Sequence, residues 1–169
     1  MRRVNVGKLV EMQRELDGYI IEKRELVISN EELIKNMFLA GYSELLEVFE
    51  CLDDKEEWID VLHFVLSISY KLGVEDEIDG YLNDYGTPPC NITKKALWYN
   101  LFAEYTSALD DYAGYKHWKD VNMNERGLTI HLAGCIETIC VAVEQLGGNV
   151  KEEYTAKYNE NIARQKRGY

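Results

Sequence analysis

Glu44-Leu-Leu-Glu47 and Glu57-Trp-Ile-Asp60 are two acidic pairs of the same spacing within one helical stretch of the chain. The acids of each pair stand three residues apart, so in a helix they share a face and their carboxylates point toward a common region. Two such helices packed together would present four carboxylates. Mg²⁺ prefers oxygen ligands and commonly shares carboxylates with substrate phosphates. The spacing therefore predicts a Mg²⁺ site, with Mn²⁺ as an acceptable substitute, and a polyphosphate substrate.

The competing interpretation is ordinary surface charge. The chain holds 30 Asp and Glu residues among 169, so acidic pairs also arise by chance on solvated helix faces. The neighbouring residues favour the metal site, because apolar residues flank Glu44 and Glu47, and the nearly apolar run 61–68 follows Asp60. Acids at the border of a buried helix need a compensating partner, which a cation supplies.

His63 lies inside this apolar run. One interpretation makes it a metal ligand, and the other a buried histidine that supports the site or packs in the core. We expect the buried histidine, because four carboxylates already suit a hard cation.

Helical periodicity dominates the chain and strand alternation is nearly absent. It predicts an all-α antiparallel bundle with helices at about residues 7–25, 30–51, 54–73, 75–84, 92–113, 125–147 and 150–166. Asn30 is a suitable N-cap, and Gly73 and Gly147 are suitable helix ends. The segment 87–91 with its two prolines breaks the pattern and joins two halves of a single domain, residues 1–169.

Composition excludes some partners. A formal net charge of −11 argues against duplex nucleic acid and anionic membranes, which both need a basic surface. We find no run suited to span a bilayer. Four cysteines without zinc-type spacing, and no secretory segment, predict a reduced cytoplasmic protein.

Two further motifs lie near the ends of the chain. The first is Gln13-Arg-Glu-Leu-Asp17, and the last is Lys157-Tyr-Asn-Glu-Asn161-Ile-Ala-Arg164-Gln-Lys-Arg-Gly-Tyr169. In this order, with the two acidic pairs between them and His63-Phe64 after the second pair, they resemble the all-α nucleoside triphosphate pyrophosphatases. Within that superfamily the resemblance is to the dimeric dUTPase-like branch related to MazG.

The resemblance implies metal-dependent hydrolysis of a nucleoside triphosphate, with dUTP giving dUMP and pyrophosphate as the favoured reaction. It implies that Glu44, Glu47, Glu57 and Asp60 hold the metal, and that Glu47, or Glu44, also acts on the attacking water. Phosphate binding would fall to Lys157, Asn161, Arg164 and Tyr169, and base binding to Gln13, Asp17 and Trp118. The residues themselves also allow an ordinary exposed glutamine at position 13 and a Trp118 that packs its own loop. The motifs leave open whether the base is uracil, cytosine or unrestricted.

One segment departs from the family pattern. A basic and aromatic segment normally follows the first acidic pair, but here the matching sequence Lys116-His-Trp118-Lys119 comes much later. It follows a predicted helix in which residues 103–110 are similar in sequence to residues 40–47. We interpret this similarity as a degenerate repeat of a helix pair. The alternative interpretation is a chance similarity between two amphipathic helices. The displacement also supports an alternative function, a catalytically inactive helical protein that binds a nucleotide or a protein. A purely structural helical module is a third interpretation.

The resemblance further implies a homodimer. The apolar segment 128–143 would serve either as core or as the dimer interface, and the sequence does not separate these roles.

Overall fold

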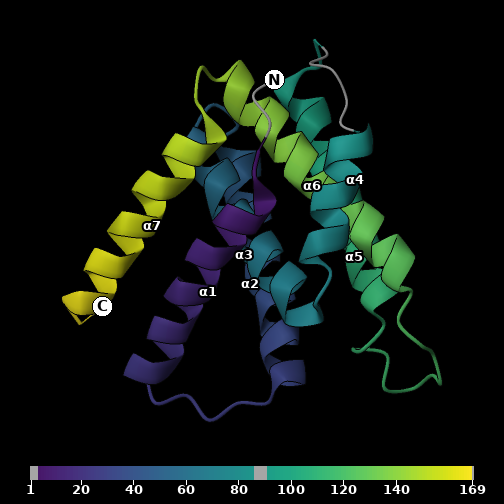
Figure 1. Ribbon diagram of the computed structural model, residues 1–169. Coiled ribbons are helices and arrows are strands. Elements are labelled where there is room, and N and C mark those ends of the chain that lie inside the picture. The colour runs from purple at the N-terminus through teal and green to yellow at the C-terminus, as the bar shows by residue number, and fades with distance from the viewer. Residues whose placement is uncertain (1–3, 86–90, 169) are drawn as a thin grey trace.

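The computed structural model describes residues 4–85 and 91–168, and these residues form seven α-helices and no strand (Figure 1). The helices are α1 (Val6–Lys23), α2 (Asn30–Glu50), α3 (Lys55–Leu72), α4 (Glu75–Tyr85), α5 (Lys94–Tyr112), α6 (Glu125–Gln145) and α7 (Val150–Lys166). Each predicted helix is present, and the predicted ends differ by two residues or fewer. The predicted all-α bundle is confirmed. The proline-containing break falls largely on residues 86–90, outside the described residues.

Local sequence explains where the helices begin and end. Side-chain caps precede six of them, and at α2 the cap is Ser29, whose hydroxyl accepts from the backbone N–H of Glu32. Asn30, the predicted cap, is instead the first helical residue, because the neighbouring serine supplies the same acceptor one position earlier. Gly73 and Gly147 follow α3 and α6 with φ of 71° and 77°, a conformation that favours glycine.

The core is built on α3 and α6. α3 packs against α1, α2, α6 and α7, and α6 packs against α3, α4 and α5. Contrary to the sequence expectation, α6 is long and apolar enough, by length and composition, to cross a membrane. However, 67% of its apolar stretch is buried inside the bundle. Segment 128–143 is therefore core, which resolves one of the alternatives left open by the sequence.

The helix pairs α2–α3 and α5–α6 meet through α3 and α6, and also through α2 and α5, which run antiparallel. Tyr42 and Tyr105, the equivalent tyrosines of the echoed segments, stack edge-on with ring centroids 5.0 Å apart. Contact between equivalent positions is what a local twofold axis between the two pairs would produce. The degenerate repeat stays a hypothesis that this packing supports.

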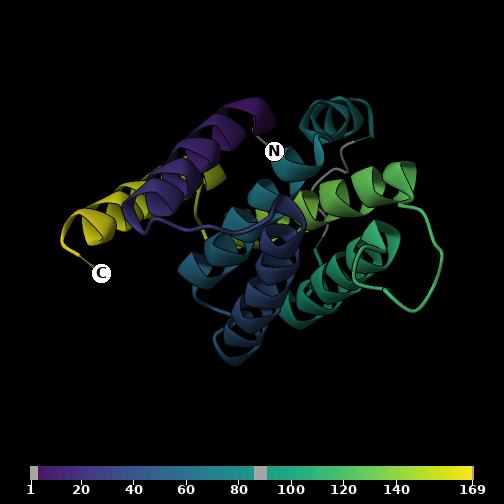
Figure 2. The ribbon, with the colours of Figure 1, turned by 90° about the horizontal axis from the view of Figure 1, so that it is seen from below.

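α1 and α7 lie together on one side of the molecule, and the loop between α5 and α6 lies on the opposite side (Figures 1 and 2). The first and last described helices are thus neighbours, and together they border the candidate site.

Candidate active site

A cavity of about 260 Å³ lies between α1, α2, α3 and α7. Each helix presents one face to it, because most lining residues are spaced three, four or seven apart. They are Gln13, Leu16, Asp17 and Ile20 of α1, Met37 and Glu44 of α2, Asp60, His63, Phe64 and Ser67 of α3, and Lys157, Asn161 and Arg164 of α7. Seven of the thirteen side chains that line this cavity were predicted from the sequence as site residues.

Three of the four predicted metal ligands form a tight cluster. Glu44, Glu57 and Asp60 each offer a carboxylate oxygen, and these oxygens lie within 4.8 Å of one another. α2 contributes Glu44, and the first two turns of α3 contribute the other two. All three are partly buried. Three hard oxygen donors that converge in this way fit a divalent cation such as Mg²⁺.

The electrostatics of the cluster agree with this fit. Burial, and then the neighbouring charges of Asp60, Glu47 and Glu57, raise the pKa of Glu44 to about 7. Burial also raises the pKa of Glu57 and of Asp60. Carboxylates crowded out of water repel one another, so the ionised cluster needs positive charge nearby.

Positive charge arrives from α7. Lys157 Nζ lies 2.9 Å from Asp60 Oδ2 and 3.8 Å from Glu56 Oε2. Asn161 and Arg164 follow on the same face of α7, and Arg164 forms an ion pair with Glu160 within the helix. Tyr169, the fourth residue predicted to bind phosphate, lies outside the described residues.

A buried polar network forms the opposite end of the cavity. Asp17 Oδ2 accepts hydrogen bonds from Ser67 Oγ at 2.6 Å and Tyr70 Oη at 2.8 Å. Asp17 Oδ1 accepts from Gln13 Nε2 at 2.8 Å. Burial raises the pKa of Asp17, while the hydrogen bonds from Ser67, Tyr70 and Gln13 lower it. Gln13 Oε1 accepts from Tyr154 Oη at 2.5 Å and lies 2.6 Å from His63 Nδ1.

His63 is 6% exposed, lines the cavity and stacks on Tyr154 with centroids 4.4 Å apart. Burial, with a smaller contribution from Lys157, lowers the pKa of His63 to about 3, so the ring is neutral at pH 7. Nε2 of this ring is buried and has no hydrogen-bond partner among the described residues. His63 is thus the buried histidine that the sequence favours, and its Nε2 is left without a partner among the described residues.

Two predicted residues stand apart from the others. Glu47 is exposed and lies outside the tight carboxylate cluster, although its charge reaches Glu44 and Asp60. Trp118 is 61% exposed on the α5–α6 loop, where it contacts Tyr115 and His117. The structure does not bring Trp118 to the cavity, because this loop lies on the side of the bundle away from α1 and α7 (Figures 1 and 2).

Sequence reasoning missed the residues that support the polar network, namely Ser67, Tyr70 and Tyr154. A signal for them was present. Ser67 and Tyr70 continue the face of α3 that carries Asp60 and His63, and Tyr154 stands one turn before Lys157 on α7. Extending each predicted face by one or two turns would have found all three.

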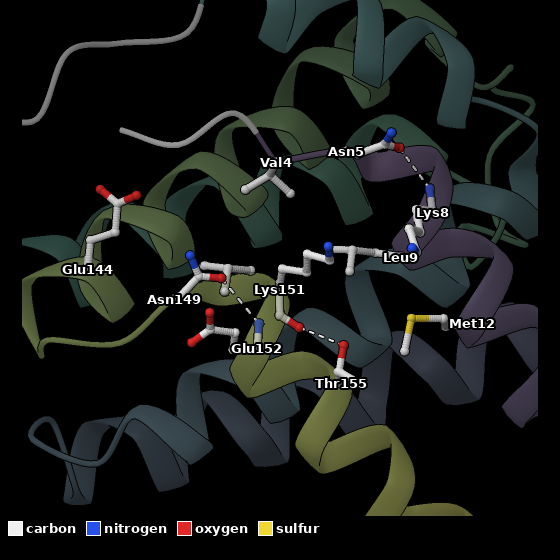
Figure 3. Close-up of a pocket in the computed structure, with 11 residues that line it drawn as sticks. Val4, Asn5, Lys8, Leu9, Met12, Glu144, Asn149, Lys151, Glu152 and Thr155 are labelled. Carbon is white, nitrogen blue, oxygen red and sulfur yellow. Dashed lines mark hydrogen bonds between the residues drawn. The ribbon is translucent and has the colours of Figure 1, made fainter.

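A second, larger cavity of about 410 Å³ lies between the first turns of α1 and α7 (Figure 3). Three of its polar side chains make local helix bonds: Asn5 caps the N–H of Lys8, Asn149 caps that of Glu152, and Thr155 donates to the Lys151 carbonyl. Much of its remaining lining is apolar. This cavity offers no convergent carboxylates, so the smaller cavity is the better candidate for phosphate chemistry.

An all-helical bundle whose partly buried carboxylates face Lys157, Asn161 and Arg164 across a small cavity fits the class of all-α nucleoside triphosphate pyrophosphatases. The model of a family described as dUTPase matches residues 52–169, which is more than half of the chain. The chain belongs to this dUTPase family. No curated protein and no solved structure matches the chain. The matched region includes Glu57, Asp60 and the α7 motif, whereas α1 and the whole of α2, which carries Glu44 and Glu47, precede it.

Proposed function

We propose that this protein hydrolyses dUTP to dUMP and pyrophosphate with Mg²⁺ bound at the carboxylate cluster. One observation carries the proposal: a single cavity joins converging carboxylates, the basic and amide side chains on one face of α7, and a buried polar network. A nucleoside triphosphate has a matching order of groups, with charged phosphates at one end and a polar base at the other. Membership in a dUTPase family supports the uracil nucleotide.

The residues divide the work by position. Glu44, Glu57 and Asp60 would hold the metal, with Glu47 at the exposed border of the cluster. A bound divalent cation would neutralise phosphate charge and lower the pKa of a bound water. Because Glu47 stands outside the tight cluster, its carboxylate is available to orient the attacking water and accept its proton.

The phosphates would be held from α7. Asn161 and Arg164 line the cavity beside Lys157, so one helical face would present an amide, a guanidinium and an ammonium to the phosphate oxygens. A guanidinium binds such oxygens in a bidentate manner. Most of the rate enhancement would then come from positioning and electrostatic stabilisation.

The alternative function is a catalytically inactive member of the same fold that binds a nucleotide or a protein. The position of the Lys116–Lys119 loop favours it, because the cavity lacks the basic and aromatic segment that the family pattern places beside the first acidic pair. This alternative requires nucleotide binding without turnover.

Hydrolysis of a panel of deoxynucleoside triphosphates with Mg²⁺ tests the proposal, with products separated by ion exchange. We expect dUMP and pyrophosphate from the parent protein, and losses of about a hundredfold or more from Glu47→Gln and Glu44→Gln. Glu50→Gln is the matched control, because Glu50 is exposed one turn further along α2. Turnover of no nucleotide would contradict the proposed hydrolysis.

The melting temperature in the presence of metal distinguishes the inactive binding protein from a purely structural module. A ligand that binds only the native state raises the melting temperature by mass action. We expect Mg²⁺ and Mn²⁺ to raise that of the parent protein and to leave Asp60→Asn unchanged. Metal stabilisation without turnover would favour the inactive binder, and no metal effect at all would favour a structural module.

We also propose a homodimer. Since α6 is mostly buried inside the bundle, we place the interface elsewhere, on an exposed apolar face formed by Leu39, Leu46, Phe49, Tyr99 and Phe102. We call it the α2–α5 face. Its aromatic rings are continuous through Trp98, which contacts Phe49, Tyr99 and Phe102.

A second copy of the chain suits this face for an electrostatic reason. Two copies, each with a net charge of −11, repel unless their contact avoids the acids. Residues 39, 42, 46 and 49 of α2 form a stripe of heptad-like spacing that carries no charge. A twofold contact would place this stripe against its own copy.

A further inference from the structure

We propose that Asp17 selects the base without touching it, by fixing which nitrogen of His63 carries the proton. The inference rests on the proposed function for its substrate, but the chemical state of His63 is a property of the protein alone. It follows from a chain of hydrogen bonds that runs from Asp17 through Gln13 to His63 and ends at the cavity.

The chain begins with an obligatory acceptor. Asp17 receives hydrogen bonds on both oxygens, from Ser67, Tyr70 and Gln13, which is the arrangement that suits an ionised carboxylate. Because Asp17 Oδ1 is an acceptor, the amide atom of Gln13 that lies 2.8 Å from it must be the NH₂ nitrogen, Nε2. The Gln13 carbonyl oxygen must therefore face the other way, toward Tyr154 and His63.

The direction of each following bond is then determined. A carbonyl oxygen only accepts, so Tyr154 Oη donates to Gln13 Oε1, and His63 must carry its proton on Nδ1 to donate to the same atom. The imidazole is neutral, so Nε2 has a bare lone pair. This nitrogen is buried, has no partner among the described residues and belongs to a side chain that lines the cavity.

A buried acceptor without a partner is costly, and in the complex that we propose the base would supply the missing donor to Nε2. N3 of uracil carries a hydrogen, whereas N3 of cytosine carries a lone pair that would repel the lone pair of Nε2. The chain of hydrogen bonds therefore favours uracil over cytosine, because it leaves His63 Nε2 as an acceptor for the N3–H group. It does not separate uracil from thymine, because both rings carry the same N3–H group.

Asp17→Asn should reverse the directions of these hydrogen bonds while it changes the shape of the side chain very little. The asparagine oxygen remains opposite the hydroxyls of Ser67 and Tyr70, so its NH₂ group faces Gln13. Gln13 must turn its carbonyl toward residue 17 and its NH₂ group toward His63. Nδ1 of His63 then accepts, the proton moves to Nε2, and the cavity presents a donor where it presented an acceptor.

Nitrogen NMR of the His63 ring at pH 7 tests the proton position without any substrate. We expect a protonated Nδ1 and an unprotonated Nε2 in the parent protein, and the reverse in Asp17→Asn. His131 of α6, which lines no part of this cavity, provides an internal reference. A parent protein with its proton on Nε2 would overturn the inference, as would an Asp17→Asn protein that keeps the parent tautomer.

Enzyme kinetics provides a second test, of base selectivity. The ratio of kcat/KM for dUTP over dCTP should fall by about tenfold or more in Asp17→Asn, with the dUTP to dTTP ratio retained. Ser67→Ala removes one donor to Asp17 but leaves the direction of the chain intact, so its dUTP to dCTP ratio should stay that of the parent. If no nucleotide is turned over but the NMR result holds, the proposed reaction fails and the inferred tautomer stands.

Discussion

Gly41 of α2 lies directly against the hydroxyl group of Tyr105 of α5, so close that a Cβ atom on residue 41 would be 1.9 Å from Tyr105 Oη. The tyrosine is fully buried and donates to the Phe38 carbonyl at 3.0 Å, and its ring cannot swing into solvent. The absent side chain therefore sets how closely α2 approaches α5.

Gly41→Ala should lower the free energy of unfolding by about 1–3 kcal/mol, because overpacking outweighs the better helix propensity of alanine. Gly18→Ala is the matched control. Gly18 is exposed in α1 with nothing within 4 Å of its Cβ position, so alanine should stabilise by about 0.5–1 kcal/mol there. Urea denaturation measures both. Equal effects of the two substitutions would show that the contact with Tyr105 does not limit the packing.

The low pKa of His63 predicts a specific acid sensitivity. In the unfolded chain His63 binds a proton near pH 6.5, but in the folded protein only near pH 3. Between these values the unfolded state holds more protons, so stability falls as pH falls, by up to about 1.4 kcal/mol per pH unit. The groups around His63 are Gln13, Tyr154 and Lys157, and they remain in the variant.

Comparison of urea unfolding at several pH values for the parent and His63→Gln isolates this contribution. The variant should lose less stability on acidification. His117→Gln, at an exposed position of the α5–α6 loop, should follow the parent. Parallel curves for the parent and His63→Gln would show that His63 titrates normally in the folded state.

The ion pair between Lys157 and Asp60 places an ammonium group where a bound cation would compete for the same carboxylate. We therefore expect Lys157→Met to bind Mn²⁺ about three- to tenfold more tightly than the parent when no nucleotide is present, while nucleotide turnover falls. Titration calorimetry with Mn²⁺ measures the first effect. Lys151→Met, at an exposed position of α7, should change neither quantity. Weaker Mn²⁺ binding in Lys157→Met would mean that the lysine organises the cluster rather than competing with the cation.

A charge placed on the α2–α5 face should prevent the proposed dimer. Leu46→Glu introduces an unpaired carboxylate into an apolar contact, so sedimentation velocity should find a monomer where the parent sediments as a dimer. Leu26→Glu adds the same charge at an exposed leucine outside this face and should leave the dimer intact. A parent protein that is monomeric at micromolar concentration would exclude the interface.

The helices were predictable because their signals are local. Periodicity, caps and glycine ends all act within a few residues, and Gly73 and Gly147 end α3 and α6 as expected. The one misplaced cap, Asn30 for Ser29, is an error between adjacent residues of similar chemistry. Only the assignment of segment 128–143 to core or interface needed the structure, since an apolar helix is equally suited to both.

Part of the residues that line the candidate site were predictable from the sequence, but their arrangement was not. Spacing brought Glu44, Glu57 and Asp60 together, but spacing alone could not rank Glu47, whose exposure depends on how α2 is rotated against α3. The bond between Gln13 and His63 joins α1 to α3 across 50 positions, and no local pattern encodes it. Trp118 fails to join the cavity because the position of its loop depends on the path of the whole chain.

The hydrogen bond between Gln13 and Tyr154 closes the largest sequence gap in the polar network, 141 positions. Loop-closure entropy grows with the logarithm of the gap, so this closure costs about 2 kcal/mol more than that of a gap of roughly ten residues, such as joins a helical hairpin. The polar network beside the cavity therefore depends on contacts between helices that lie far apart in the sequence. A nucleotide that spans α1 and α7 would offset part of this cost, so substrate would fasten the two ends of the described chain together.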